Sequence, residues 1–304
     1  MLVHIRLGKT DYLAANAINV AICCLANFVV SDRMVFAVVL SVGFVLSVGS
    51  PDASAADVNP TASQAFERYA RLTEARMDAE REGSAPFLWI DRQPEGQRQS
   101  TYGRLRRNEI VISKMQTRDG DAAIRFPNAL CHHWLGTMLI EGASLARSVS
   151  LMQNYERYPD IYRPEIRKSR LISRQDTHFT VDLQLFMKKV VSVVMNSSLV
   201  VDYVPVAANR IQVRSRSTRV AEVSKPDTPE AREEPEGHDS GYLWRFNNYC
   251  SLEERPEGTY VQCESISLSR DIPFGLGWLV GPFVNDVPRE SLEFTLAAMR
   301  RALR

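Results

Sequence analysis

Alternation between hydrophobic and polar residues is the dominant pattern of the chain from Leu130 onward. Between residues 178 and 187, Phe179, Val181 and Leu183 occupy every second position and polar residues stand between them. A period of two is typical of an antiparallel strand with one buried and one solvated face. Comparable runs recur, and we predict seven strands: 130–140, 165–174, 177–187, 190–205, 209–223, 241–254 and 259–270.

Three segments have helical spacing instead. Residues 62–82 follow Thr61, which forms a capping-box pattern with Gln64, and they carry apolar residues along one side. Residues 145–155 show the same spacing between the first two predicted strands. The last segment, 288–303, follows Asp286, a favourable N-cap. Its apolar stripe predicts a helix that packs against the sheet.

The remaining segments have less regular patterns. Residues 87–90, 110–115 and 122–126 predict short strands, the last two joined by a turn at 119–121. Residues 225–240 contain three prolines and six carboxylates, and they have no aliphatic side chain larger than alanine. Such a segment has nothing to bury, so we predict an exposed, mobile loop there.

Residues 242–303 run through two long strand patterns, an apolar glycine-rich segment and an amphipathic helix. In this order they resemble the C-terminal half of START-like (Bet v 1-like, SRPBCC) helix-grip proteins, and the resemblance is to an exported bacterial branch of that superfamily. The resemblance covers more than half of the chain. It extends through His132-His133-Trp134, the Asn-Tyr-Glu-Arg-Tyr-Pro run at 154–159, Ser217-Thr218-Arg219, Leu243-Trp244-Arg245 and Arg289-Glu290-Ser291-Leu292.

The resemblance implies an α+β helix-grip fold, in which a seven-stranded curved antiparallel sheet wraps around a long C-terminal helix. It also implies a ligand cavity between sheet and helix, and a hydrophobic or amphipathic, lipid-like ligand, but no reaction. With the patterns above, it predicts three parts: a leader (1–55), an accessory N-terminal helix and hairpin (56–128), and the helix-grip domain (129–304).

The predicted leader contains two apolar stretches, 13–30 and 34–48. Arg33 precedes the second stretch, and the small residues Ala-Ser-Ala follow it immediately before Ala56. This is the pattern of a secretory signal, so we predict cleavage before Ala56 and export to the periplasm or the medium. Residues upstream of the second stretch then form an extension from a misassigned start. The alternative is a retained membrane anchor, since about 18 apolar residues span a bilayer.

Composition narrows the choice of partners. The 304 residues carry a formal net charge of +1, from 37 basic and 36 acidic residues. A chain so nearly neutral has no field that would concentrate it on nucleic acid, and nucleic acid is therefore not an expected partner. Hydrophobic residues make up 45% of the chain, which suffices for a core without metals.

The predicted mature chain keeps Cys131, Cys250 and Cys263. A two-residue turn between Cys250 and Cys263 would place them opposite each other, whereas a glycine bulge at Gly258 would move them to opposite faces. Because Pro-Glu-Gly suits a type I turn followed by a bulge, we predict buried free thiols. Cysteine and histidine spacings match no zinc site, and no metal or cofactor is expected.

Arg219 is the strongest single polar candidate for ligand binding. In the predicted strand 209–223 it shares a face with Ile211 and Val213. A charge on an apolar face needs a partner. Either Arg219 anchors a ligand carboxylate or phosphate, or it forms an internal pair with Glu264.

His132 and His133 point to opposite faces of one strand and therefore cannot share a metal ion. His132 lies on the side of Trp134 and is the better pocket candidate. The structural alternative for each is a histidine hydrogen-bonded beneath the N-terminal region. No catalytic residue is assigned, because no nucleophile or carboxylate stands at a defined spacing.

Aromatic residues offer an apolar lining. Tyr242, Trp244 and Phe246 alternate along one predicted strand, and they either floor a cavity or form plain core. The apolar segment 272–284 contains three glycines and two prolines. It is a lid over the pocket mouth, a segment that makes transient contact with a membrane, or a packed connection covered by the N-terminal helix.

The expected function is binding or carrying of a hydrophobic small molecule or lipid. Two alternatives stay open: a cyclase or hydrolase on the same fold, with His132 or Glu264 titrating in an open pocket, and a protein interaction module with a filled groove. The predicted ligand-binding residues are Arg219, Trp134, Trp244, Phe246, Trp278, Leu292 and His132.

Overall fold

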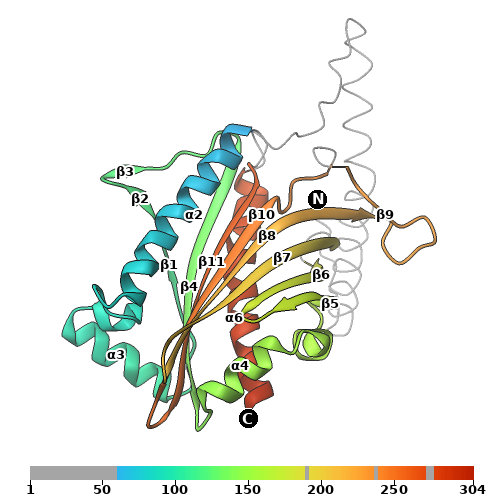
Figure 1. Ribbon diagram of the computed structural model, residues 1–304. Coiled ribbons are helices and arrows are strands. Elements are labelled where there is room, and N and C mark those ends of the chain that lie inside the picture. Colours follow the sequence, from blue (N-terminus) through green and yellow to red (C-terminus); the bar gives the residue numbers. More distant parts are fainter. Residues whose placement is uncertain (1–59, 189–191, 236–238, 272–276) are drawn as a thin grey trace, which may run out of the picture. The chain divides into compact units, whose positions relative to one another are not determined.

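An antiparallel sheet of nine strands is the centre of the described part of the chain (Figure 1). The computed structural model describes residues 60–188, 192–235, 239–271 and 277–304, all within the unit Ala55–Arg304. All seven predicted strands are present. In spatial order the sheet contains β1 (Val111–Lys114), β4 (Ala129–Glu141), β11 (Gly258–Arg270), β10 (Arg245–Arg255), β8 (Arg210–Ser224), β7 (Ser192–Ala207), β6 (His178–Lys188) and β5 (Ile166–Gln175), while β9 (Arg232–Glu233) pairs with β8.

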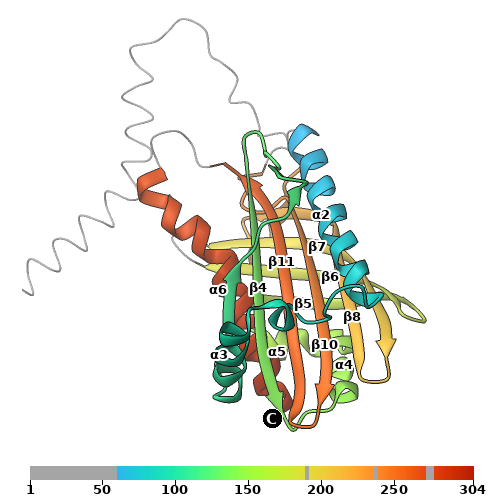
Figure 2. The ribbon, with the colours of Figure 1, turned by 90° about the vertical axis from the view of Figure 1, so that its left-hand side faces the viewer.

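Helix α6 (Gly277–Leu303) lies along one face of this sheet, which we call the inner face (Figure 2). Gly136 of β4 permits the close approach. A Cβ atom added there would meet the Leu296 Cδ1 atom at 2.5 Å and the Leu292 Cδ2 atom at 3.2 Å. The main core therefore forms between the C-terminal half of α6 and the sheet. Its buried members include Met138, Ile140, Phe179, Val181, Leu199, Val213, Leu252, Val261, Leu292, Leu296, Met299 and Leu303.

The predicted start of the last helix is wrong. The helix is already formed at Gly277, so Pro288 lies inside it and not at its first turn. Proline lacks a backbone donor, but this loss is local and does not end a helix that packing supports. Residues 277–284 are thus helical rather than part of a loop, and 272–276 lie outside the described residues.

The predicted helical insert between the first two strands is confirmed. Helix α4 (Leu145–Gln153) begins after Ser144, whose side chain accepts a hydrogen bond from the Arg147 N–H group. A 3-10 turn, η2 (Tyr155–Arg157), and the short helix α5 (Tyr158–Ile161) follow it. Tyr155 and Tyr203 join this insert to β7 through their hydroxyl groups, 2.9 Å apart.

Helix α2 (Pro60–Arg81) lies on the opposite, outer face of the sheet and confirms the predicted N-terminal helix (Figures 1 and 2). Its apolar side forms a second, smaller core with residues of β10 and β11. That core includes Phe66, Tyr69, Met77, Tyr249, Ile266 and Leu268.

The rest of the accessory region departs from the predictions. Residues 87–90 do not form a strand; η1 (Trp89–Arg92) is a 3-10 helix, and α3 (Glu95–Arg106) follows it unpredicted. Only Thr101 and Leu105 of α3 are buried, so it lacks the apolar stripe that marks a helix in a sequence. The predicted hairpin is shorter, between β2 (Arg118–Asp119) and β3 (Ala122–Ala123), because β1 pairs with β4 instead.

The prediction of free thiols at Cys250 and Cys263 is also wrong. The two residues are directly paired in the register of β10 and β11 and form a disulfide, with their Cα atoms 4.1 Å apart. Arg255 pairs with Gly258, so the connection has two residues and the expected bulge does not shift the register. Among the described cysteines, Cys131 is the free one.

Candidate ligand-binding site

Strand β4 sends successive side chains to the two faces of the sheet. Its even-numbered residues belong to the inner face, where Gly136 meets α6, and its odd-numbered residues belong to the outer face. His132 and Trp134 are therefore on the inner face and His133 on the outer, as predicted. The two histidines have unrelated surroundings.

Cross-strand pairing extends His132 and Trp134 into two rows of mostly polar side chains across the inner face. The row through Trp134 lies directly beside the apolar row formed by Gly136, Cys263, Cys250 and Val213, and the row through His132 lies on the other side of the row through Trp134. The first consists of Lys114, Trp134, Ser265, Asn248 and Ser215, each in register with the next, and the second of His132, Ser267 and Phe246. We call these eight positions, taken together, the inner polar rows.

The first of the inner polar rows is incompletely covered, whereas the three residues of the second row are buried. Asn248, Ser265 and Ser215 are half-buried, although they belong to β10, β11 and β8, which are interior strands of the sheet. In Figure 2, α6 lies close to β4 along its C-terminal half and farther from the sheet toward its start. The partial exposure of Asn248, Ser265 and Ser215 means that solvent reaches the first row.

The Oγ atom of Ser269, on the inner face, is buried and has no partner within the described part of the chain, and two ring nitrogens of β4 on the same face also have none. These nitrogens are the Nε2 atom of His132 and the Nε1 atom of Trp134. His132 is only 7% exposed. Leaving a buried polar group unpaired costs about 1–3 kcal/mol of stability. The unpaired nitrogens of His132 and Trp134, two residues apart, therefore mark a place where polar atoms of a ligand could be bound.

The imidazole of His132 is neutral at pH 7. Burial, with a smaller contribution from the nearby charge of Lys114, lowers the pKa of His132 from its ordinary value of 6.5 to about 4. A neutral imidazole has one donor and one acceptor nitrogen. His132 thus offers a hydrogen bond but no charge.

Phe246 and Leu292 belong to the main core on the inner face, as the predicted lining requires. Trp244 does not. It precedes the first residue of β10, escapes the alternation of that strand, and belongs with Phe66 of α2 to the outer core. Tyr242 is 42% exposed. The side chain of Trp278 lies outside the described residues.

The predicted position of Arg219 is wrong. A β-bulge separates the pairs Leu199–Ser217 and Ser198–Arg219, so one extra residue reverses the alternation of β8. Arg219 is exposed on the outer side and pairs with Glu233 of β9, not with Glu264. The same pairing corrects the loop predicted at 225–240, which contains β9.

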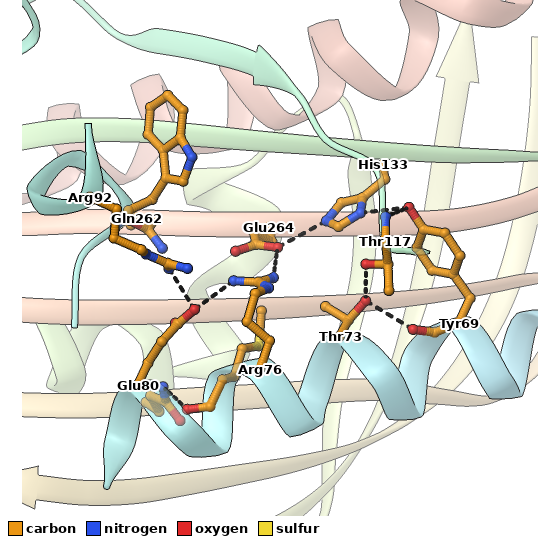
Figure 3. A network of polar contacts seen from close by, with 12 residues as sticks. Tyr69, Thr73, Arg76, Glu80, Arg92, Thr117, His133, Gln262 and Glu264 are labelled. Carbon is orange, nitrogen blue, oxygen red and sulfur yellow. Dashed lines mark hydrogen bonds and ion pairs between the residues drawn. The ribbon is translucent and has the colours of Figure 1, made fainter. Parts of the chain in front are cut away.

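A buried polar network lies on the outer face, between α2 and the sheet (Figure 3). The hydroxyl of Tyr69 lies 2.9 Å from the His133 Nδ1 atom, and the His133 Nε2 atom lies 2.9 Å from a carboxylate oxygen of Glu264. Arg76 donates to Glu264 and also to Glu80, the latter at 2.7 Å. His133 is thus hydrogen-bonded beneath the N-terminal region, which is the structural role that the sequence analysis gave as the alternative to ligand binding.

The charges of this network are mutually compensated. Burial alone would raise the pKa of Glu264, but the hydrogen bond with His133 and the charge of Arg76 oppose it, and the pKa lies below the usual 4.5. Burial raises the pKa of Glu80 in spite of Arg76 and Arg92. The carboxylates of Glu80 and Glu264 are each 1% exposed. These residues bind α2 to the sheet and do not face an open site.

Two open hollows on the described surface do not involve the predicted ligand-binding residues. One, of about 350 Å³, is lined by polar residues around Glu222 and Ser240, and the other, of about 370 Å³, lies between α3 and β1. The described residues contain no cluster of three or more side chains suited to a metal ion. No helix in the described ranges has the length and apolarity needed to cross a membrane.

Sequence reasoning missed Lys114 and the serines of the inner polar rows. A signal for the serines was present: Ser265, Ser267 and Ser269 occupy every second position of β11, on the face of Cys263. Lys114 was harder to find, because only the pairing of β1 with β4 brings it beside Trp134.

No protein-family model and no curated protein matches the chain. Solved structures similar to it include a STAR-related lipid transfer protein fragment from Xanthomonas axonopodis, with 17% identity, a TM-score of 0.40, and coverage of 63% of this chain and 98% of that one. A START superfamily protein from Mycobacterium smegmatis has 14% identity, a TM-score of 0.35, and coverage of 58% and 96%. The Zhui aromatase/cyclase from Streptomyces sp. R1128 has 12% identity, a TM-score of 0.37, and coverage of 57% and 92%. The α+β helix-grip arrangement itself rests on the strand order and on α6, as described above.

Proposed function

We propose that the protein binds an amphipathic small molecule between the inner polar rows and the first half of α6. The observation that carries this proposal is the presence of half-buried polar residues at the centre of the inner face, together with the unpartnered donors of His132 and Trp134. A mostly apolar site with a few polar groups is the usual form of a small-molecule site.

The two sides of the proposed site differ in polarity. The sheet contributes serines, Asn248, His132 and Trp134, whereas the sequence of α6 begins with the apolar run Gly-Trp-Leu-Val-Gly-Pro-Phe-Val at 277–284. A purely apolar ligand would leave the polar rows unpaired, and a purely polar one would gain nothing from an apolar helix. A ligand with one polar and one apolar part satisfies both sides.

The enzyme alternative has less support. Of its two candidate residues, Glu264 is buried in the outer network and lies on the other face from His132. The network leaves it no access to a ligand on the inner face. His132 alone gives a hydrogen bond and no nucleophile, so the site supports binding better than catalysis.

Export and transient membrane contact through 272–284 remain parts of this proposal. The disulfide between Cys250 and Cys263 supports export, because disulfides persist mainly in oxidising compartments. A mature chain whose mass begins at Ala56 would agree with it, and an intact leader would contradict the predicted cleavage.

Native mass spectrometry of the full chain, purified from an exporting host, tests the binding function. We expect an adduct that dissociates on denaturation and is recovered as an amphipathic molecule by solvent extraction. A protein that carries no such molecule, and that also fails to bind added oleate saturably after extraction, would contradict the proposed function.

A further inference from the structure

Lys114 extends the first inner polar row to the edge of the sheet. It is the last residue of β1, an edge strand, and is paired in register with Trp134. Its Nζ atom lies 5.9 Å from the centre of the Trp134 ring. The side chain is exposed, whereas Trp134 beside it is half-buried and His132 is buried. A cation at the rim thus leads to two hydrogen-bonding groups deeper in the inner face.

This group consists almost entirely of donors. The ammonium of Lys114 and the indole N–H of Trp134 donate only, and the His132 Nε2 atom donates in one of its two tautomers. Within the described ranges, no carboxylate lies in ion-pair distance of Lys114. A donor-rich group without its own acceptors complements a ligand group that has several acceptor atoms.

We propose that Lys114, Trp134 and His132 bind the acidic head group of a single-chain amphiphile, with the carboxylate of a fatty acid as the simplest case. The inference rests on the proposed function and specifies its ligand class. The carboxylate accepts from Trp134 and His132 and faces the charge of Lys114. The apolar chain then lies toward α6 and the row that contains Val213.

The proposed orientation follows from the gradient of burial. A charged head group is most costly to desolvate, and Lys114 at the sheet edge lets it remain near solvent while the donors replace part of its hydration. An amine head group would meet Lys114 with like charge. A neutral alcohol would use one donor and leave the others unpaired.

Calorimetric titration of the full chain with oleate, oleyl alcohol and acetate at pH 7.5, below the aggregation limit of each lipid, tests this inference. We expect oleate to bind at least fivefold more tightly than oleyl alcohol, and acetate not to bind measurably. Lys114→Met should weaken oleate about fivefold with little change for oleyl alcohol, as for a partly exposed ion pair. Lys168→Met, on the opposite edge strand β5, is the matched control and should change neither.

A second variant, at Trp134, tests the head-group site independently of Lys114. Trp134→Phe keeps an aromatic ring but removes the donor, and we expect oleate affinity to fall about tenfold. Equal binding of oleate and oleyl alcohol by the unaltered chain, or equal behaviour of the Lys114→Met and Lys168→Met variants, would overturn the head-group site and leave the proposed function intact. Tight binding of acetate would show that the site binds an anion without an attached alkyl chain, and this result would also overturn the head-group site. Failure of both lipids to bind would instead refute the proposed function.

Discussion

Two adjacent histidines show how strongly the environment decides what a residue does. His133 has a partner on each ring nitrogen, Tyr69 and Glu264, and is fully used in holding α2. His132 is buried on the other face with its Nε2 atom unpartnered in the described structure. The same residue type at consecutive positions thus stabilises one face and leaves a binding group on the other.

His132 should make stability depend on pH. Its folded-state pKa of about 4 lies below the ordinary 6.5, so between these values the unfolded chain binds the proton and the folded chain does not. Stability is therefore unaffected above pH 6.5 and falls by about 3 kcal/mol as the pH drops to 4. Urea unfolding of the unaltered chain and of His132→Gln at pH 7 and pH 4 measures this, and the variant should lose about 3 kcal/mol less.

The titration of Glu264 does not affect the difference in pH-dependent stability between the unaltered chain and His132→Gln. Its pKa is below 4.5, so the stability that it contributes is lost only as the pH falls further, and it is present in both proteins. Equal losses of stability in the unaltered chain and in His132→Gln would show that His132 is not buried in its neutral form.

At the scale of elements, helix α2 is bound to the sheet by charges as much as by apolar contact. Arg76 is the central residue, because it pairs with both Glu80 and Glu264, and these two carboxylates are each 1% exposed. Such a network contributes little net stability when complete, but losing one member leaves a buried charge without its partner. Arg76 is therefore the position where a single change should loosen α2.

Arg76→Met should lower the free energy of unfolding by about 3 kcal/mol. Arg71→Met is the control on the same helix, because Arg71 is 69% exposed and lies 4.0 Å from Glu67. The control should change stability by less than about 0.5 kcal/mol. Equal urea midpoints for the two variants would show that the buried network does not hold α2.

The disulfide should stabilise the hairpin of β10 and β11. It closes a sequence separation of 13 residues between Cys250 and Cys263, for which chain entropy predicts about 3 kcal/mol. Replacing both by alanine should lower the free energy of unfolding by about that amount. As the control, the Cys131→Ala variant should lose as much stability on addition of reductant as the unaltered chain does. If the Cys250→Ala/Cys263→Ala variant were as stable as the oxidised unaltered chain, the disulfide would be contradicted.

Local patterns explain why most elements could be predicted and some details could not. The alternation in β6 and the apolar stripe of α2 are visible within a few residues, so both elements were found. The bulge beside Arg219 depends on how β7 and β8 pair, and nothing local marks it. The position of Lys114 beside Trp134 likewise depends on a contact between separate segments. Fold was therefore more predictable than the candidate site.

For the molecule as a whole, the central claim is that the inner face binds a ligand and the outer face does not. The two faces share one sheet but differ in covering: α2 closes the outer face with paired charges, and α6 leaves the first of the inner polar rows partly open. A tryptophan stands on each side, since Trp134 belongs to the inner face and Trp244 to the outer core. These residues allow the two faces to be distinguished in one experiment.

The most direct test is quenching of tryptophan fluorescence by 9,10-dibromostearate, whose bromine atoms act only at short range. Titration of the full chain, Trp134→Phe and Trp244→Phe should give saturable quenching in the unaltered chain and in Trp244→Phe. The Trp134→Phe variant should lose a large part of it. Undiminished quenching in Trp134→Phe, with the loss found in Trp244→Phe, would place the ligand on the outer face and contradict the account.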